Sequence, residues 1–84
     1  MVWPEWWFWN IEITPHVEKR MVQRDFSEIE LRTMLHGAHN FENDAVFGRF
    51  KIKSKLKGKS WEIIVEPDSI EKLLVIITGY QIEE

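Results

Sequence analysis

Three side chains that could take part in acid–base chemistry recur at intervals of four residues: His16, Arg20 and Arg24. On a helix, residues four apart project from one side, so this spacing aligns an imidazole with two guanidinium groups. An imidazole titrates near neutral pH and can exchange a proton with a ribose 2′-hydroxyl, while arginines hold the phosphate. That is the chemistry of metal-free RNA cleavage. The alternative is a solvent-exposed helix face whose arginines pair with nearby carboxylates such as Glu18 and Asp25.

A second candidate surface is a row of basic side chains at every second position. A period of two is the strand period, so in an extended chain these cations share one face. The segment holds six of the eleven Lys and Arg residues and none of the fourteen Asp and Glu residues. It predicts a docking surface for RNA phosphate or for an acidic protein; the alternative is a solvated face that discourages edge pairing. The row consists of Arg49, Lys51, Lys53, Lys55, Lys57 and Lys59.

Two further groups of residues have weaker links to chemistry. His36 and His39 flank a glycine helix cap and have no third ligand nearby apart from Glu42 or Asp44, so we expect no metal and no cofactor. The aromatic N-terminus predicts a segment that packs over the sheet or forms a homodimer interface through Trp6, Trp7 and Trp9, with stacking on unpaired bases as the alternative. That N-terminal group consists of Trp3, Trp6, Trp7, Phe8 and Trp9.

The elements that must position these groups begin with a strand and two helices. Residues 8–14 alternate apolar and polar side chains, which predicts a first strand. Thr14 followed by Pro15 is a favoured helix start, and we expect this helix to reach about Arg24. Ser27 and Glu30 form a capping box for a second helix that ends at 36, before Gly37. The segment 39–48 is predicted to be a loop.

The basic row is predicted to form a hairpin with residues 60–66. A turn at Gly58-Lys59 pairs Leu56 with Trp61; a turn at 57–58 shifts the partners by two and keeps the same faces. With the first turn, Lys55, Lys51 and Arg49 face Glu62, Glu66 and Asp68. Lys53, Lys57 and Lys59 then lack a carboxylate opposite them, which makes them the stronger candidates for binding a partner.

The last strand is predicted over 73–80, where side chains are apolar on both faces, as in a central strand. The predicted fold is therefore α+β, in the order β-α-α-β-β-β, with an antiparallel sheet and two helices on one face. Because the helices cover the apolar face, we expect the basic face to lie on the side opposite the helix that carries His16.

This order and several short motifs resemble an uncharacterised bacterial family within the RelE/ParE superfamily of small toxins. The residues that carry the resemblance are the stretch His16, Arg20, Met21 and Arg24, the segment Ile29, Glu30 and Leu31, and the ending Ile77, Thr78, Gly79 and Tyr80.

The resemblance implies a toxin of a toxin–antitoxin system with a cognate antitoxin. RelE-type relatives cleave messenger RNA without a metal, using basic residues and a tyrosine, whereas ParE-type relatives act on DNA gyrase. A RelE-like endoribonuclease would use His16, Arg20, Arg24 and Tyr80 as its catalytic set. In that picture Tyr80 orients a nucleotide or donates a proton; alternatively it is a strand-end tyrosine with its hydroxyl in water.

Length and composition allow one small domain of 84 residues, with 1–7 as an aromatic extension and 8–80 as the core. The chain has no cysteine, so disulfides and thiolate sites are excluded. The N-terminus does not read as a signal peptide, and no apolar run approaches the ~20 residues of a membrane helix. We therefore expect a cytoplasmic protein with no membrane contact. A binding module without catalysis and a structural homodimer are the competing functions.

Overall fold

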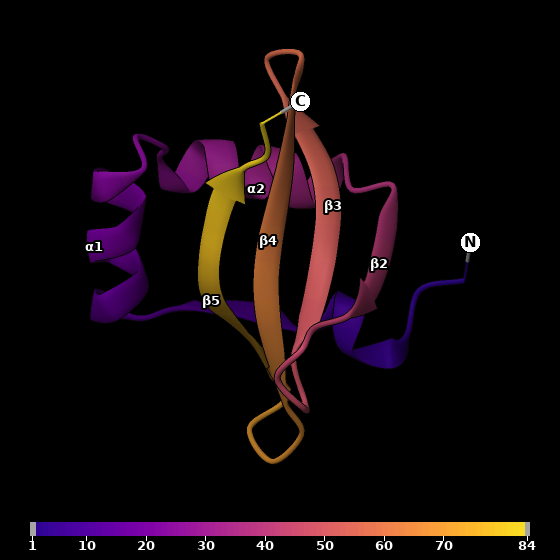
Figure 1. Cartoon of the computed structure of the whole chain (residues 1–84). Helices are drawn as coiled ribbons and strands as arrows, with labels where there is room; N and C mark the ends of the chain where they lie inside the picture. Colours follow the sequence, from indigo (N-terminus) through magenta and orange to yellow (C-terminus); the bar gives the residue numbers. More distant parts are fainter. Residues whose placement is uncertain (1, 84) are drawn as a thin grey trace.

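The computed structural model describes residues 2–83 and has two layers, a five-stranded sheet and a pair of helices (Figure 1). Figure 1 looks at the sheet from the side opposite α2, which runs behind it, while α1 lies beyond β5. In chain order the elements are the 3₁₀-helix η1 (Glu5–Phe8), β1 (Asn10–Ile13), α1 (Pro15–Gln23), α2 (Glu28–His36), β2 (Asn40–Asn43), β3 (Phe50–Leu56), β4 (Lys59–Asp68) and β5 (Leu73–Gln81).

The strands are arranged β1-β5-β4-β3-β2, and the prediction of a purely antiparallel sheet is wrong. β1 runs parallel to β5, while the other pairs are antiparallel. The helix pair carries the chain from β1 to the opposite edge, and three reversals then bring β5 back beside β1. β5 is thus an internal strand, as predicted.

A strand also forms where a loop was predicted. β2 pairs with β3 at the sheet edge, and its Phe41 lies opposite Ile52 on the helix side. The Phe41 ring packs against Trp3 at 5.0 Å and Trp6 at 5.8 Å between ring centroids. These contacts join residues far apart in sequence, so the local pattern around residue 41 gave no sign of this strand.

Both helices begin as predicted. The Thr14 hydroxyl accepts a hydrogen bond from the Val17 N–H at 3.2 Å. Ser27 and Glu30 form the reciprocal capping box, at 3.1 and 3.0 Å. The helices bury their apolar stripes against the sheet, with α1 over β5 and α2 over β3. The core they enclose includes Val17, Met21, Phe26, Leu31, Met34, Ile52, Ile63, Val65, Leu74 and Ile76.

The β3–β4 hairpin adopts the second of the two predicted registers. Lys57 and Gly58 form the turn with φ of 52° and 77°, the positive values of a type I′ turn. Trp61 therefore faces Ser54. The preferred prediction, which paired Trp61 with Leu56, is wrong by a shift of two residues. Ser54 suits this place because it is small, and its hydroxyl donates to the Met34 carbonyl of α2 at 2.6 Å.

The aromatic N-terminus packs onto the helix side of the sheet. Trp3 stacks on Trp7 with ring centroids 4.1 Å apart, and Trp6 lies 4.7 Å from Phe50 of β3. All three tryptophans pack against the core, whereas Phe8 is 77% exposed. The first strand starts at residue 10 instead of 8 because residues 5–8 form η1. Residue 1 of the predicted extension lies outside the described residues.

The capping box offers a direct test of this fold. Ser27→Ala removes an acceptor for a helix N–H and should lower the free energy of unfolding by about 1 kcal/mol. For a domain of this size that corresponds to a melting temperature lower by roughly 4–8 °C. Ser69→Ala is the matched control, because within residues 2–83 the exposed Ser69 makes no side-chain hydrogen bond. Equal melting temperatures for the two variants would contradict the assigned cap.

Candidate nucleic-acid interface

The sheet face that points away from the helices, here called the outer face, carries a transverse row of polar side chains. Lys53 of β3, Glu62 of β4 and Tyr80 of β5 are direct cross-strand partners and so share this face. The Tyr80 hydroxyl donates to Glu62 Oε1 at 2.9 Å, and Lys53 Nζ donates to Oε2 at 2.8 Å. One carboxylate therefore links three strands.

A β-bulge decides that Tyr80 belongs to the outer face. Strict alternation along β5 would place Tyr80 on the same side as the buried Ile76, toward the helices. The register between β4 and β5 shifts at Ile64/Val65, so Ile76 pairs with Val65 but Tyr80 pairs with Glu62. Gly79 takes the helix side instead, where a Cβ would lie 3.1 Å from the ring of Phe26.

Arg24 joins this row from the helix layer. β1 pairs with β5 only as far as Ile76, which leaves the upper edge of β5 open toward the end of α1. The Arg24 guanidinium reaches that edge, where it donates to the Thr78 hydroxyl and, at 3.4 Å, to the Gly79 carbonyl. It also lies 5.9 Å from the centre of the Tyr80 ring, a cation–π contact. Within residues 2–83, Arg24 has no carboxylate partner.

We refer to Arg24, Lys51, Lys53, Glu62 and Tyr80 as the outer-face cluster. Lys51 is the cation next to Lys53 on β3. Glu42 of the edge strand β2 lies 3.9 Å from Lys51 and 3.6 Å from Lys53. These distances and the 51% exposure of the Glu42 side chain make both ion pairs weak.

The cluster favours a neutral phenol beside a charged carboxylate. Burial, followed by the hydrogen bond to Glu62, raises the pKa of Tyr80 to about 12, and the charge of Asp44 adds to this. Burial opposes ionisation of Glu62, but the hydrogen bonds from Lys53 and Tyr80 outweigh it and lower the pKa of that carboxyl. The bond to Glu62 raises the pKa of Lys53. At neutral pH Tyr80 is therefore a hydrogen-bond donor.

The predicted basic row splits at the hairpin turn. Lys51, Lys53 and Lys55 lie on the outer face, but Lys57 pairs with Glu30 of α2 at 3.3 Å. Lys59 is the direct partner of Leu56 and so belongs to the helix side.

The predicted carboxylate partners change with the register. Glu62 binds Lys53 instead of Lys55, and Arg49 pairs with Glu66 at 3.1 Å instead of facing Asp68. The prediction that Lys53 and Lys57 lack carboxylate partners is therefore wrong. Lys55 is exposed and, within residues 2–83, forms no ion pair.

The four residues predicted as a catalytic set do not form one group. Arg24 and Tyr80 meet on the outer face, while His16 is exposed on the first turn of α1. Eight residues of helix separate His16 from Arg24 by about 12 Å along the axis. Neither His16 nor Arg20 makes a side-chain hydrogen bond or ion pair within the described chain, and in residues 2–83 no cluster of His, Asp and Glu could hold a metal ion.

Sequence reasoning assigned no site role to Glu62 or Thr78. Each belongs to a predicted strand, but its position relative to Tyr80 depends on the bulge and on the hairpin register. The one local signal was an acidic residue between Trp61 and Ile63. In the structure Glu62 is 8% exposed, and a carboxylate buried to that degree requires partners.

Comparisons with known proteins add no assignment. The sequence matches no family model, and it has no match among curated proteins or solved structures. Within residues 2–83, no helix has the length and apolar character needed to cross a bilayer.

The titration of Tyr80 tests the cluster, because it is the chain's single tyrosine. The folded protein should form tyrosinate near pH 12, whereas the unfolded chain should do so near pH 10. Because the folded pKa is the higher one, the stabilisation from this group is complete below pH 10 and is lost as pH rises toward 12. Ultraviolet absorbance follows the ionisation.

Glu62→Gln sharpens the test. Without the charged acceptor the pKa of Tyr80 should fall, though not to its ordinary value, because burial is the larger cause. A folded wild-type protein that titrates like the unfolded chain would disprove the Tyr80–Glu62 contact.

Proposed function

We propose that this chain is a toxin-like protein that binds RNA through the outer face of its sheet. The observation that carries the proposal is Arg24, whose guanidinium crosses from the helix layer to the outer face. Among residues 2–83 its partners there are all neutral. Arginine suits a phosphate because its donors form a fork that matches two oxygens. Lys55, on the same face, is a second exposed cation.

The cluster's own pairing also supports binding. Glu62 fixes Lys53 and Tyr80 before a ligand arrives. The Lys53 ammonium keeps further N–H donors for a ligand, whereas the single Tyr80 proton goes to Glu62, so the phenol oxygen offers an acceptor. Lys51 has only weak pairing with the exposed Glu42, and a phosphate competes easily for it. A surface with preorganised donors loses less conformational entropy on binding than one with mobile side chains.

An acidic protein segment, such as the tail of a cognate antitoxin, would use the same cations. RNA is preferred because Arg24 and Tyr80 together offer a guanidinium and a phenol hydroxyl, which suit phosphate and ribose groups. Binding measurements with each ligand distinguish the two. If an acidic peptide binds and single-stranded RNA does not, the face belongs to a protein partner. The homodimer through Trp6, Trp7 and Trp9 is a separate proposal that uses the opposite side of the molecule.

Lys55 and Lys59 of the hairpin, which form no ion pair with any of residues 2–83, provide a matched pair of variants. Lys55→Gln removes an exposed cation from the outer face, whereas Lys59→Gln removes an exposed cation on the helix side. Affinity for a single-stranded RNA should fall with salt, and loss of one phosphate contact should reduce the log–log slope by about 0.7. We expect this reduction for Lys55→Gln alone, measured by fluorescence anisotropy. Equal slopes for both variants would place the RNA elsewhere.

Metal-independent RNA cleavage is the second candidate, favoured by the contact between Arg24 and the Tyr80 ring. Arg24 would offset the charge that develops on the phosphate, and the Tyr80 hydroxyl would exchange its hydrogen bond to Glu62 for one to an oxygen of the scissile phosphate. A phenol with a pKa near 12 is a poor base at neutral pH, and the cluster includes no histidine. For that reason binding is proposed first.

Growth arrest and RNA cleavage on expression test this second candidate. Tyr80→Phe keeps the ring over Arg24 but removes the hydroxyl, and it should reduce cleavage by about 10²-fold or more if the phenol acts on the reacting phosphate. His36→Ala serves as the control for an exposed histidine, and His16→Ala tests the sequence prediction. Loss of activity in His16→Ala with full activity in Tyr80→Phe would move the catalytic centre to the start of α1.

A further inference from the structure

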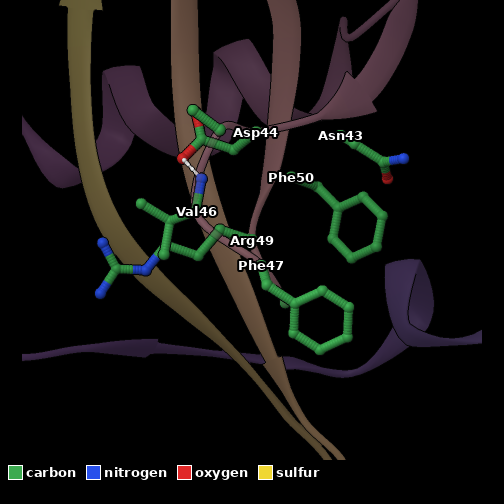
Figure 2. A pocket seen from close by; sticks show the side chains of 8 residues that line it. Asn43, Asp44, Val46, Phe47, Arg49 and Phe50 are labelled. Carbon is green, nitrogen blue, oxygen red and sulfur yellow. Dashed lines mark hydrogen bonds between the residues drawn. The ribbon is translucent and has the colours of Figure 1, made fainter.

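We infer that the loop between β2 and β3 holds an unpaired nucleobase, so that the ligand of the outer face is single-stranded RNA. This inference rests on the proposed function, because it assigns the base to a strand whose phosphates lie on the outer face. The loop encloses a hollow of about 360 Å³, within the range of ligand pockets, which starts near 300 Å³. Figure 2 shows the side chains that line it.

Phe47 is the main reason for this assignment. It lies within the turn of the loop and is fully exposed, at 101%, so it adds nothing to the core. In Figure 2 its ring lies on the same side of the loop as the ring of Phe50. Every nucleobase has a π face that stacks on an exposed aromatic ring.

Hydrogen bonds order the backbone of the loop that carries Phe47. The Asp44 N–H donates to the Arg49 carbonyl at 3.0 Å, and the Arg49 N–H donates to the Val46 carbonyl at 3.2 Å. The Val46 N–H in turn donates to Asp44 Oδ2 at 3.3 Å, the dashed line in Figure 2. Gly48 has φ of +86°, a value that suits glycine and closes the turn. A preorganised loop has less entropy to lose when a ring stacks on it.

Polar groups beside the hollow suit a base and its phosphate. Asn43 is the direct partner of Phe50, and its amide both donates and accepts, as the edge of a base requires. Two lining residues also face the outer face: Arg49 pairs with Glu66 of β4, and the charge of Asp44 acts on Tyr80. Asn43 and Phe50 face the helix side, so the hollow lies at the rim between the two faces of the sheet.

Two probes separate base stacking from phosphate binding. One is a short labelled oligouridylate, and the other is an abasic ribose-phosphate chain of the same length. The wild-type protein should bind the oligouridylate more tightly than the abasic chain. Phe47→Ala should weaken oligouridylate binding by about tenfold, the order expected for one base stacked on an aromatic ring. The same variant should leave the affinity for the abasic chain unchanged. Phe47→Trp should retain the preference.

Ile70→Ala is the matched control, since Ile70 is 89% exposed in the turn between β4 and β5 and should affect neither probe. Phe47→Ala should melt like the wild type, because the exposed ring is not part of the core. Equal affinity for the two probes, or no effect of Phe47→Ala, would overturn this inference and leave the proposed function standing. If the wild type binds neither probe, both proposals fail.

Discussion

The β-bulge between β4 and β5 is the constraint on which the outer face depends. Without it, alternation would carry Tyr80 to the side of Ile76 and place it among the helix-side residues. With it, Tyr80 stands opposite Glu62, and Gly79 leaves room for Phe26 on the core side. One irregularity therefore does two things. It keeps a polar hydroxyl out of the core and it assembles a polar row across three strands.

Glu62 is the group that makes this row rigid. It is 8% exposed, and a buried carboxylate is costly unless its oxygens are satisfied. Lys53 and Tyr80 satisfy one oxygen each. The row stays intact only while the hairpin register keeps Lys53 opposite Glu62. The Lys57-Gly58 turn and the bulge therefore act together, one setting the β3 side and the other the β5 side.

Ion pairing decides which cations of the basic row are available to a ligand. The sequence predicted carboxylates opposite Arg49, Lys51 and Lys55. In the structure Arg49, Lys53 and Lys57 pair with carboxylates from β4 or α2. The outer-face cations left for a ligand are Lys55 and the weakly paired Lys51 on β3, and Arg24 from the helix layer. Arg24 shows why a helix on the opposite face of the sheet can still contribute to the outer face. β1 is short and pairs with β5 only as far as Ile76, so the edge of β5 beyond that residue is open to Arg24.

The sequence by itself determined the helices, their caps, the hairpin and the internal strand. Each depends on contacts within a few residues, such as Ser27 with Glu30, or on simple alternation of side chains. Short-range patterns of this kind are physical causes that can be read locally. The family resemblance and the RNA chemistry expected of Arg24 and Tyr80 also came from the sequence, and they stay proposals.

Only the tertiary structure decided which of these side chains meet. The strand β2 depends on Phe41 packing against Trp3 and Trp6, and the parallel β1–β5 pair depends on the path of the whole chain. Arg24 meets Tyr80 because the edge of β5 beyond Ile76 is open beside the end of α1, whereas His16 lies two turns away at the start of that helix. A bulge or a two-residue shift of register changes few local preferences, but it changes the face or the partner of every residue beyond it. For that reason the sequence identified the candidate residues, and the packing of the sheet selected the group that could act together.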